Sequence, residues 1–239
     1  MNIGINGSSY ILQPVPVEQP SRAGKVPSGE AELVRSLAFG AEKWESYFGE
    51  VGVEPPLPPD IAAILMSPCP LWPGKTVGET HKLVLVPQTV NGALLTLDLL
   101  EQLIQRPIKG KTTKYRHYWH NLKKEHGSTS CSSHWILMTK DVIPGSRSQV
   151  YTAQQAQVAA LLGGYQVPRL LEAAVCVLIE HVETGTRFFS DNPWTYNRCQ
   201  ERVDGYQTVV GGFAATGLNI STDFHGARAR CGVAGLRIF

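Results

Sequence analysis

Cysteine and histidine are the side chains of this chain that most readily supply nucleophiles and metal ligands. The five cysteines, Cys69, Cys131, Cys176, Cys199 and Cys231, are widely separated and form no C-x-x-C pair. Zinc sites need closely spaced cysteines and disulfide frameworks need an even number, so this pattern favours reduced, isolated thiols. We therefore expect no metal site.

Three other stretches approach known catalytic or phosphate-binding motifs and fall short of them. Residues 117–126 contain three histidines without H-E-x-x-H spacing. Residues 143–148 contain Gly145 and Ser146 but lack the second glycine of a nucleophile elbow. Residues 73–76, Pro-Gly-Lys-Thr, end like a phosphate-binding loop without its earlier glycine. We expect no catalytic residue and no cofactor.

A different signal lies in the last stretch of the chain. Residues 208–239 contain no Lys, Glu, Gln, Met or Trp, although these types are frequent before it. A codon that ends in a pyrimidine and is randomised at its first two positions can encode none of them. Every residue from 214 to 231 belongs to the permitted set. The segment is either a Gly/Ala-rich hairpin without long polar side chains or a product of codon-level diversification.

Length and charge are those of an ordinary globular chain. It has 239 residues, 43% of them hydrophobic, and a formal net charge of +2. The basic stretch 109–117 is interpreted as a solvated loop, so we expect no nucleic-acid partner. The absence of a long apolar run and of a signal peptide predicts no membrane insertion and a cytoplasmic location, with non-classical secretion or surface display left open.

Prolines divide the chain into two parts. We expect residues 1–59 to be a proline-rich N-terminal arm with a short helix at 31–39, because the run 54–60 can be neither helix nor central strand. Residues 60–239 would form the main domain. Apolar periodicity predicts strands at 81–87, 135–139 and 186–189, and helices at 96–105, 149–162 and 168–182. Asn91-Gly92 predicts a tight turn and Thr96 a helix N-cap.

Four motifs in this order resemble the formylglycine-generating-enzyme type of C-type lectin fold. They are Tyr-Gln-Val-Pro-Arg-Leu-Leu-Glu-Ala-Ala at 165–174, Pro-Trp at 193–194, Gly-Gly-Phe at 211–213 and Gly-Leu-Arg at 235–237. The resemblance covers about residues 80–239 and implies an α+β fold with two helices around small antiparallel sheets and much irregular loop. The oxidising enzymes of this fold need a cysteine pair just after Gly-Gly, where this chain has Ala214, Ala215, Thr216 and Asn219.

A second group with this fold consists of the variable proteins of diversity-generating retroelements, in which adenine-directed mutagenesis rewrites exposed positions of the terminal segment. Resemblance to this group and the missing residue types together predict a ligand-binding display protein, not an enzyme, with its variable region at 211–239. The apolar positions should be scaffold: Phe213, Leu218, Ile220, Val233, Leu236 and Ile238. The exposed positions should contact the ligand: Ala215, Thr216, Asn219, Ser221, Thr222, Asp223, Phe224, His225, Ala227, Arg228 and Arg230.

Two alternatives to the display protein stay open. One is an oxidase on the same fold with displaced ligands, for which Cys199 and Cys231 are the candidates. The other is a host-interaction module with the proline-rich arm as its docking segment. For the display protein we expect an unknown protein or other macromolecular ligand and a monomer or small homo-oligomer. Trp194 lies either in the core, which is more typical of Trp in this motif, or with Tyr196 at the rim of the site.

Overall fold

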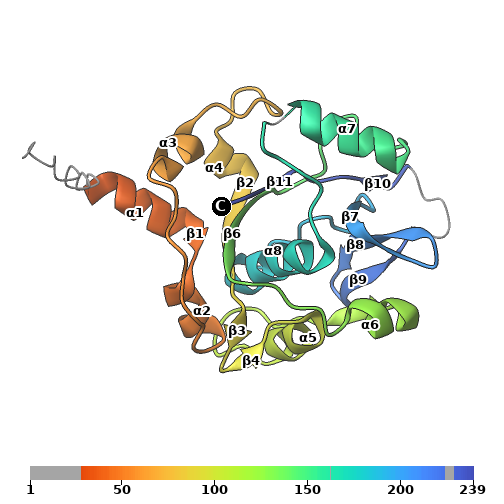
Figure 1. The fold of residues 1–239 in the computed structure, drawn as a ribbon, viewed down its shortest axis with the longest axis horizontal. Coiled ribbons are helices and arrows are strands. Elements are labelled where there is room, and N and C mark those ends of the chain that lie inside the picture. The colour runs from red at the N-terminus through yellow and green to blue at the C-terminus, as the bar shows by residue number, and fades with distance from the viewer. Residues whose placement is uncertain (1–27, 162, 224–228) are drawn as a thin grey trace, which may run out of the picture.

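A central helix between two sheets organises the protein. The computed structural model describes residues 28–161, 163–223 and 229–239. Helix α8 (Leu170–Thr184) contacts strands of both main sheets (Figure 1). Every residue from 170 to 182 is buried. A helix that is apolar on nearly all sides belongs in a core, because it has no face to offer to water. The expected α+β class is confirmed.

The first sheet has the strand order β1-β2-β6-β11. Its strands are β1 (Ala38–Phe39), β2 (His81–Val86), β6 (His134–Thr139) and β11 (Leu236–Ile238). Strand β1 pairs with β2 in parallel, and the other pairs are antiparallel. The predictions at 81–87 and 135–139 are confirmed as the two central strands, both rich in the apolar residues that a covered sheet requires.

The segment before residue 60 contributes to this core. Helices α1 (Ser28–Leu37) and α2 (Ala41–Tyr47) flank strand β1. Phe39 and Trp44 are fully buried, and Trp44 Nε1 donates a hydrogen bond of 2.8 Å to the Leu85 carbonyl of β2. Residues 38–48, which we assigned to the arm, thus pack into the main domain, whereas residues 1–27 lie outside the described part.

The second sheet carries the terminal segment and has the order β10-β7-β8-β9-β5. Its strands are β5 (Tyr115–Tyr118), β7 (Tyr196–Val203), β8 (Tyr206–Ala214), β9 (Gly217–Thr222) and β10 (Cys231–Gly232). One face packs on α8, where the Phe213 ring lies 4.9 Å from the His181 ring. Val210 and Ile220 are fully buried. Val209 and Ser221 alternate with them along β8 and β9 and lie on the opposite face.

Shorter elements complete the fold. They are α3 (Ile61–Met66), α4 (Val77–Thr80), β3 (Thr89–Val90), β4 (Ala93–Leu94), α5 (Leu97–Gln105), α6 (His120–His126) and α7 (Tyr151–Leu161). The turn at Asn91-Gly92 is confirmed, with φ of 51° and 78°. The Thr96 cap is confirmed as well, because its hydroxyl accepts a hydrogen bond from Leu99 N at 3.1 Å.

Two expectations about these elements were wrong. The described ranges contain eight helices rather than two, because several short helices occupy connections too brief to show a period. The strand expected at 186–189 is an irregular turn in which Phe189 adopts φ of 50°. None of the helices in the described ranges is both long and apolar enough to span a bilayer.

Candidate functional site

The Gly-Gly motif lets strand β8 pass directly beneath two aromatic rings. Trp194 and Tyr196 stack with centroids 6.1 Å apart and an interplanar angle of 17°. Gly212 has φ of 54°, and a Cβ there would lie 2.6 Å from Tyr196 Oη and 2.7 Å from Trp194 Cζ3. Any larger residue would push the rings away from the backbone. The motif therefore positions the aromatic pair on the open face of the sheet.

Strand register then creates a hollow beside this pair. One row across all five strands consists of Cys231, Tyr196, Gly211, Asn219 and His117. Alternate residues of a strand share a face, so the next row, Arg198, Val209 and Ser221, lies on the same side. On this side of the sheet the two rows border a hollow with a volume of about 450 Å³.

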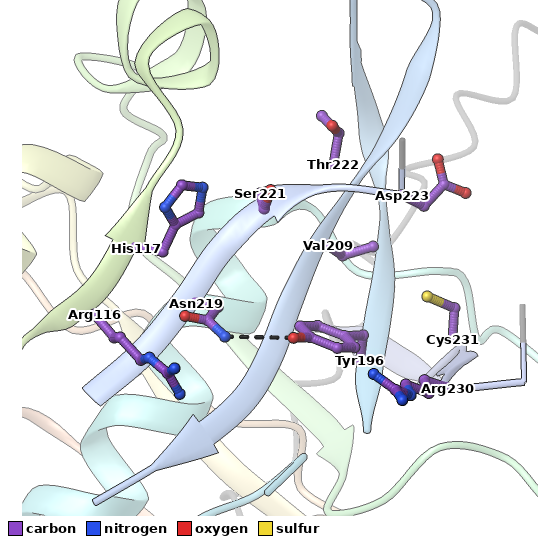
Figure 2. A pocket seen from close by; sticks show the side chains of 10 residues that line it. All are labelled: Arg116, His117, Tyr196, Val209, Asn219, Ser221, Thr222, Asp223, Arg230 and Cys231. Atoms are coloured by element: carbon purple, nitrogen blue, oxygen red, sulfur yellow. Dashed lines mark hydrogen bonds between the residues drawn. The ribbon is translucent and has the colours of Figure 1, made fainter. Parts of the chain in front are cut away.

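Figure 2 shows ten side chains that line this hollow. They come from all five strands of the sheet and from the residues next to β9 and β10, and they are Arg116, His117, Tyr196, Val209, Asn219, Ser221, Thr222, Asp223, Arg230 and Cys231. Five of them are among the positions expected to contact the ligand, namely Asn219, Ser221, Thr222, Asp223 and Arg230. The terminal segment thus brings much of its predicted surface to one place.

The other predicted contact positions are not in the hollow. Ala215 and Thr216 are exposed in the turn between β8 and β9, and Ala215 borders a separate depression with Lys111 and Arg187. Phe224, His225, Ala227 and Arg228 lie outside the described residues.

The predicted scaffold residues are buried, with one exception. Phe213, Leu218, Ile220, Val233 and Leu236 are each 0% exposed. Ile238 is 42% exposed, so its assignment to the scaffold was wrong. It lies at the end of the edge strand β11, where no neighbouring strand covers its outer side.

Asn219 is less exposed than we expected. Its exposed fraction is 9%, and its Nδ2 donates a hydrogen bond of 3.3 Å to Tyr196 Oη (Figure 2). The reason is that β5 pairs along the outer side of β9, which is therefore an interior strand of the sheet. Asn219 forms part of the floor of the hollow rather than a free surface position.

Asp223 is held by a buried arginine and does not project freely. Arg198 Nε donates to Asp223 Oδ2 at 2.9 Å, and the two side chains are 4% and 16% exposed. Arg198 Nη1 also donates to the Gln149 carbonyl at 2.9 Å and to Gln154 Oε1 at 2.8 Å. Because a buried guanidinium needs a counter-charge, this carboxylate has a structural role. Asp223, which we expected to be a free contact position, is thus engaged in an ion pair at the border of the hollow.

The chain that returns to the sheet after residue 228 is fixed mainly through its backbone. Tyr196 N donates to the Arg230 carbonyl at 2.8 Å, and Arg147 Nη1 donates to the same carbonyl at 3.3 Å. Further along, Ala234 N donates to Asn197 Oδ1 at 2.6 Å. These bonds use the main chain of Arg230 and leave its exposed side chain free to differ.

The two candidate thiols lie in surroundings that keep them protonated. Burial raises the pKa of Cys199 well above its ordinary value and that of Cys231 to about 11. A neutral thiol is a poor nucleophile and a poor metal ligand. In the described ranges all five cysteines are free, and no group of three or more His, Cys, Asp and Glu side chains could hold a metal ion.

The hollow also contains two residues that sequence reasoning missed. Arg116 and His117 belong to β5, although we interpreted 109–117 as a solvated loop. Arg116 sits at the irregularity in the β5–β9 pairing, and its guanidinium carbon lies 5.8 Å from the centroid of the half-buried Trp194 ring. The available signal was the aromatic and basic run Tyr-Arg-His-Tyr at 115–118, since aromatic residues favour strands.

No protein-family model, no curated protein and no solved structure matches this chain.

Proposed function

We propose that this protein is a ligand-binding display protein of the C-type lectin fold whose terminal segment is diversified by a retroelement. The observation that carries the proposal is the hollow on the open face of the second sheet. Residues of the segment that avoids Lys, Glu, Gln, Met and Trp gather there on a sheet whose other face is buried against α8. This arrangement separates the buried residues, which must stay constant, from the residues that border the hollow, which can change.

The energetics of the terminal segment support this separation. Within the described part of the chain, the Ser221 and Thr222 side chains make no hydrogen bond, and both border the hollow. Both are half-buried, and substitutions away from the core and from hydrogen-bond partners usually change stability by less than about 0.5 kcal/mol. Replacing a buried neighbour such as Ile220 with alanine costs about 2–5 kcal/mol. Diversification of the first kind of position therefore leaves the fold intact.

The oxidase alternative has less support from the site. The positions just after Gly-Gly are Ala214 and Ala215, and the buried thiols of Cys199 and Cys231 have raised pKa values. A copper titration of the wild type and of Cys199→Ser and Cys231→Ser tests this alternative. Tight copper binding that both substitutions abolish would contradict the display function.

A pair of matched libraries tests the proposal itself. The first randomises Ser221, Thr222 and Arg230 with pyrimidine-ending codons. The control randomises Thr152, Gln155 and Ala156, which are exposed on one face of α7. Both libraries are selected against the same panel of unrelated folded proteins. We expect specific binders from the first library only. Equal yields from both, or loss of folding throughout the first, would refute the proposal.

A further inference from the structure

The hollow carries positive charge that its own carboxylate does not neutralise. Arg116 and Arg230 line it, and both are exposed. The carboxylate of Asp223 is already committed to Arg198 at 2.9 Å. Within the described ranges, neither the Arg116 nor the Arg230 side chain forms an ion pair or a hydrogen bond. Two guanidinium groups are thus available to an incoming group.

Arg116 is oriented by the aromatic pair. Its guanidinium lies over the Trp194 ring, which in turn stacks on Tyr196. At 5.8 Å the ring attracts the cation, whose hydrogen-bond donors match the two oxygens of a carboxylate. This contact favours a position of the cation beside the hollow, and such pre-organisation lowers the entropy lost on binding.

Arg116 also differs from Arg230 in its origin. It belongs to β5, far from the terminal segment in sequence, whereas Arg230 belongs to the segment itself. Rewriting the terminal segment changes Arg230 and its neighbours but leaves Arg116, Trp194 and Tyr196 unchanged. One half of the hollow is constant while the other half varies.

We propose that the hollow binds an acidic side chain, Asp or Glu, of a partner protein, and that Arg116 is a fixed recognition residue for it. This inference rests on the proposed display function and adds the chemistry that all variants share. Arginine and aromatic residues grouped in a recess are typical of binding hot spots. The half of the hollow that varies then determines which acidic segment of a partner protein binds.

The amount and spread of charge favour a protein carboxylate over nucleic acid. A hollow of about 450 Å³ with two unpaired guanidinium groups suits one or two side chains. Nucleic-acid binding needs a basic track along several phosphates, and the chain as a whole has a formal net charge of only +2.

Selection from a random peptide library tests the inference. The full-length protein is immobilised, and random twelve-residue peptides are selected on it. The affinity of each binder is measured for the wild type, for Ser221→Arg, which places a large side chain in the hollow, and for three charge variants. Arg116→Gln removes the charge, Arg116→Lys keeps the charge without the planar fork, and Lys124→Gln is the charge-matched control, exposed on α6. Circular dichroism checks that each variant is folded.

We expect peptides enriched in Asp or Glu that bind Arg116→Gln at least about tenfold more weakly than the wild type, as for a hot-spot residue. Arg116→Lys should recover part of the loss, and Lys124→Gln should bind like the wild type. Changing the acidic residue of the peptide to its amide should weaken binding to the wild type but not to Arg116→Gln, as a coupled pair requires.

Three outcomes overturn the inference. In the first, the selected peptides lack acidic residues, or bind Arg116→Gln as tightly as the wild type, but bind Ser221→Arg more weakly. The hollow then binds ligands without requiring an acidic residue, and the display function stands. If no selected peptide responds to substitution in the hollow, both proposals fail. If random single-stranded DNA binds as tightly as the best peptides and competes with them, the partner is nucleic acid.

Discussion

Replacing Asp223 with alanine should destabilise the protein far more than replacing Ser221, although both border the same hollow. Removal of one partner from a buried ion pair costs about 3–5 kcal/mol. Arg198 keeps its bonds to the Gln149 carbonyl and Gln154 Oε1, and Asp223 is 16% exposed, so water reaches the pair. These two features reduce the expected loss to about 2–3 kcal/mol.

Urea and thermal unfolding measure this loss. In a chain of this size each kcal/mol lowers the melting temperature by about 2–4 °C, so Asp223→Ala should melt about 4–12 °C lower than the wild type. Asp223→Asn keeps an acceptor for Arg198 Nε and should lose about half as much free energy, roughly 1–1.5 kcal/mol. Ser221→Ala should stay within about 0.5 kcal/mol. If Asp223→Ala and Ser221→Ala unfold at the same urea concentration and temperature, the structural role assigned to the Asp223 carboxylate is wrong.

Three further predictions use the same unfolding assays. Gly212→Ala should cost about 1–3 kcal/mol more than Gly205→Ala, because both have positive φ but only Gly212 would meet the aromatic rings, and equal losses would contradict this. For His134, burial alone lowers the pKa, but hydrogen bonds to Cys131 and Glu172 outweigh it and raise the pKa to about 10. Its folded-state pKa lies above the unfolded one, so its contribution is complete below about pH 6.5 and disappears as the pH rises through about 10. His134→Gln should flatten this pH dependence of the urea midpoint, and an unchanged dependence would refute the assignment. Lys82→Met leaves the carboxylates of Glu180 and Glu183 without their buried partner and should cost about 3 kcal/mol, and a loss below about 1 kcal/mol would count against that network.

Local patterns in the sequence predicted the elements whose signals are local. The apolar runs of β2 and β6 and the Thr96 cap of α5 each depend on a few neighbouring residues. The position of α8 between two sheets depends on contacts between distant segments, which periodicity cannot show. Its apolar character on all sides was visible, but the partners that cover it were not.

In the candidate site, too, local signals could be read from the sequence and contacts between distant segments could not. Ser221, Thr222 and Arg230 were predicted from composition and motif order, and they line the hollow. Arg116 was missed because β5 joins the sheet by pairing in parallel with β9, a strand that lies far away in sequence. The buried role of Asp223 was missed for a similar reason, since the register that brings Arg198 to it is not readable from either segment alone.

The coding sequence of the terminal segment tests the central claim most directly. We expect a near-identical repeat of this segment beside a reverse transcriptase gene, differing from it only where the repeat has adenine. Sister copies of the gene should vary at positions such as Ser221, Thr222 and Arg230, should keep Leu218 and Ile220, and should never place Lys, Glu, Gln, Met or Trp at the variable positions. A genome without such a repeat, or sister copies with those five residue types at the lining positions of the hollow, would contradict diversification by a retroelement.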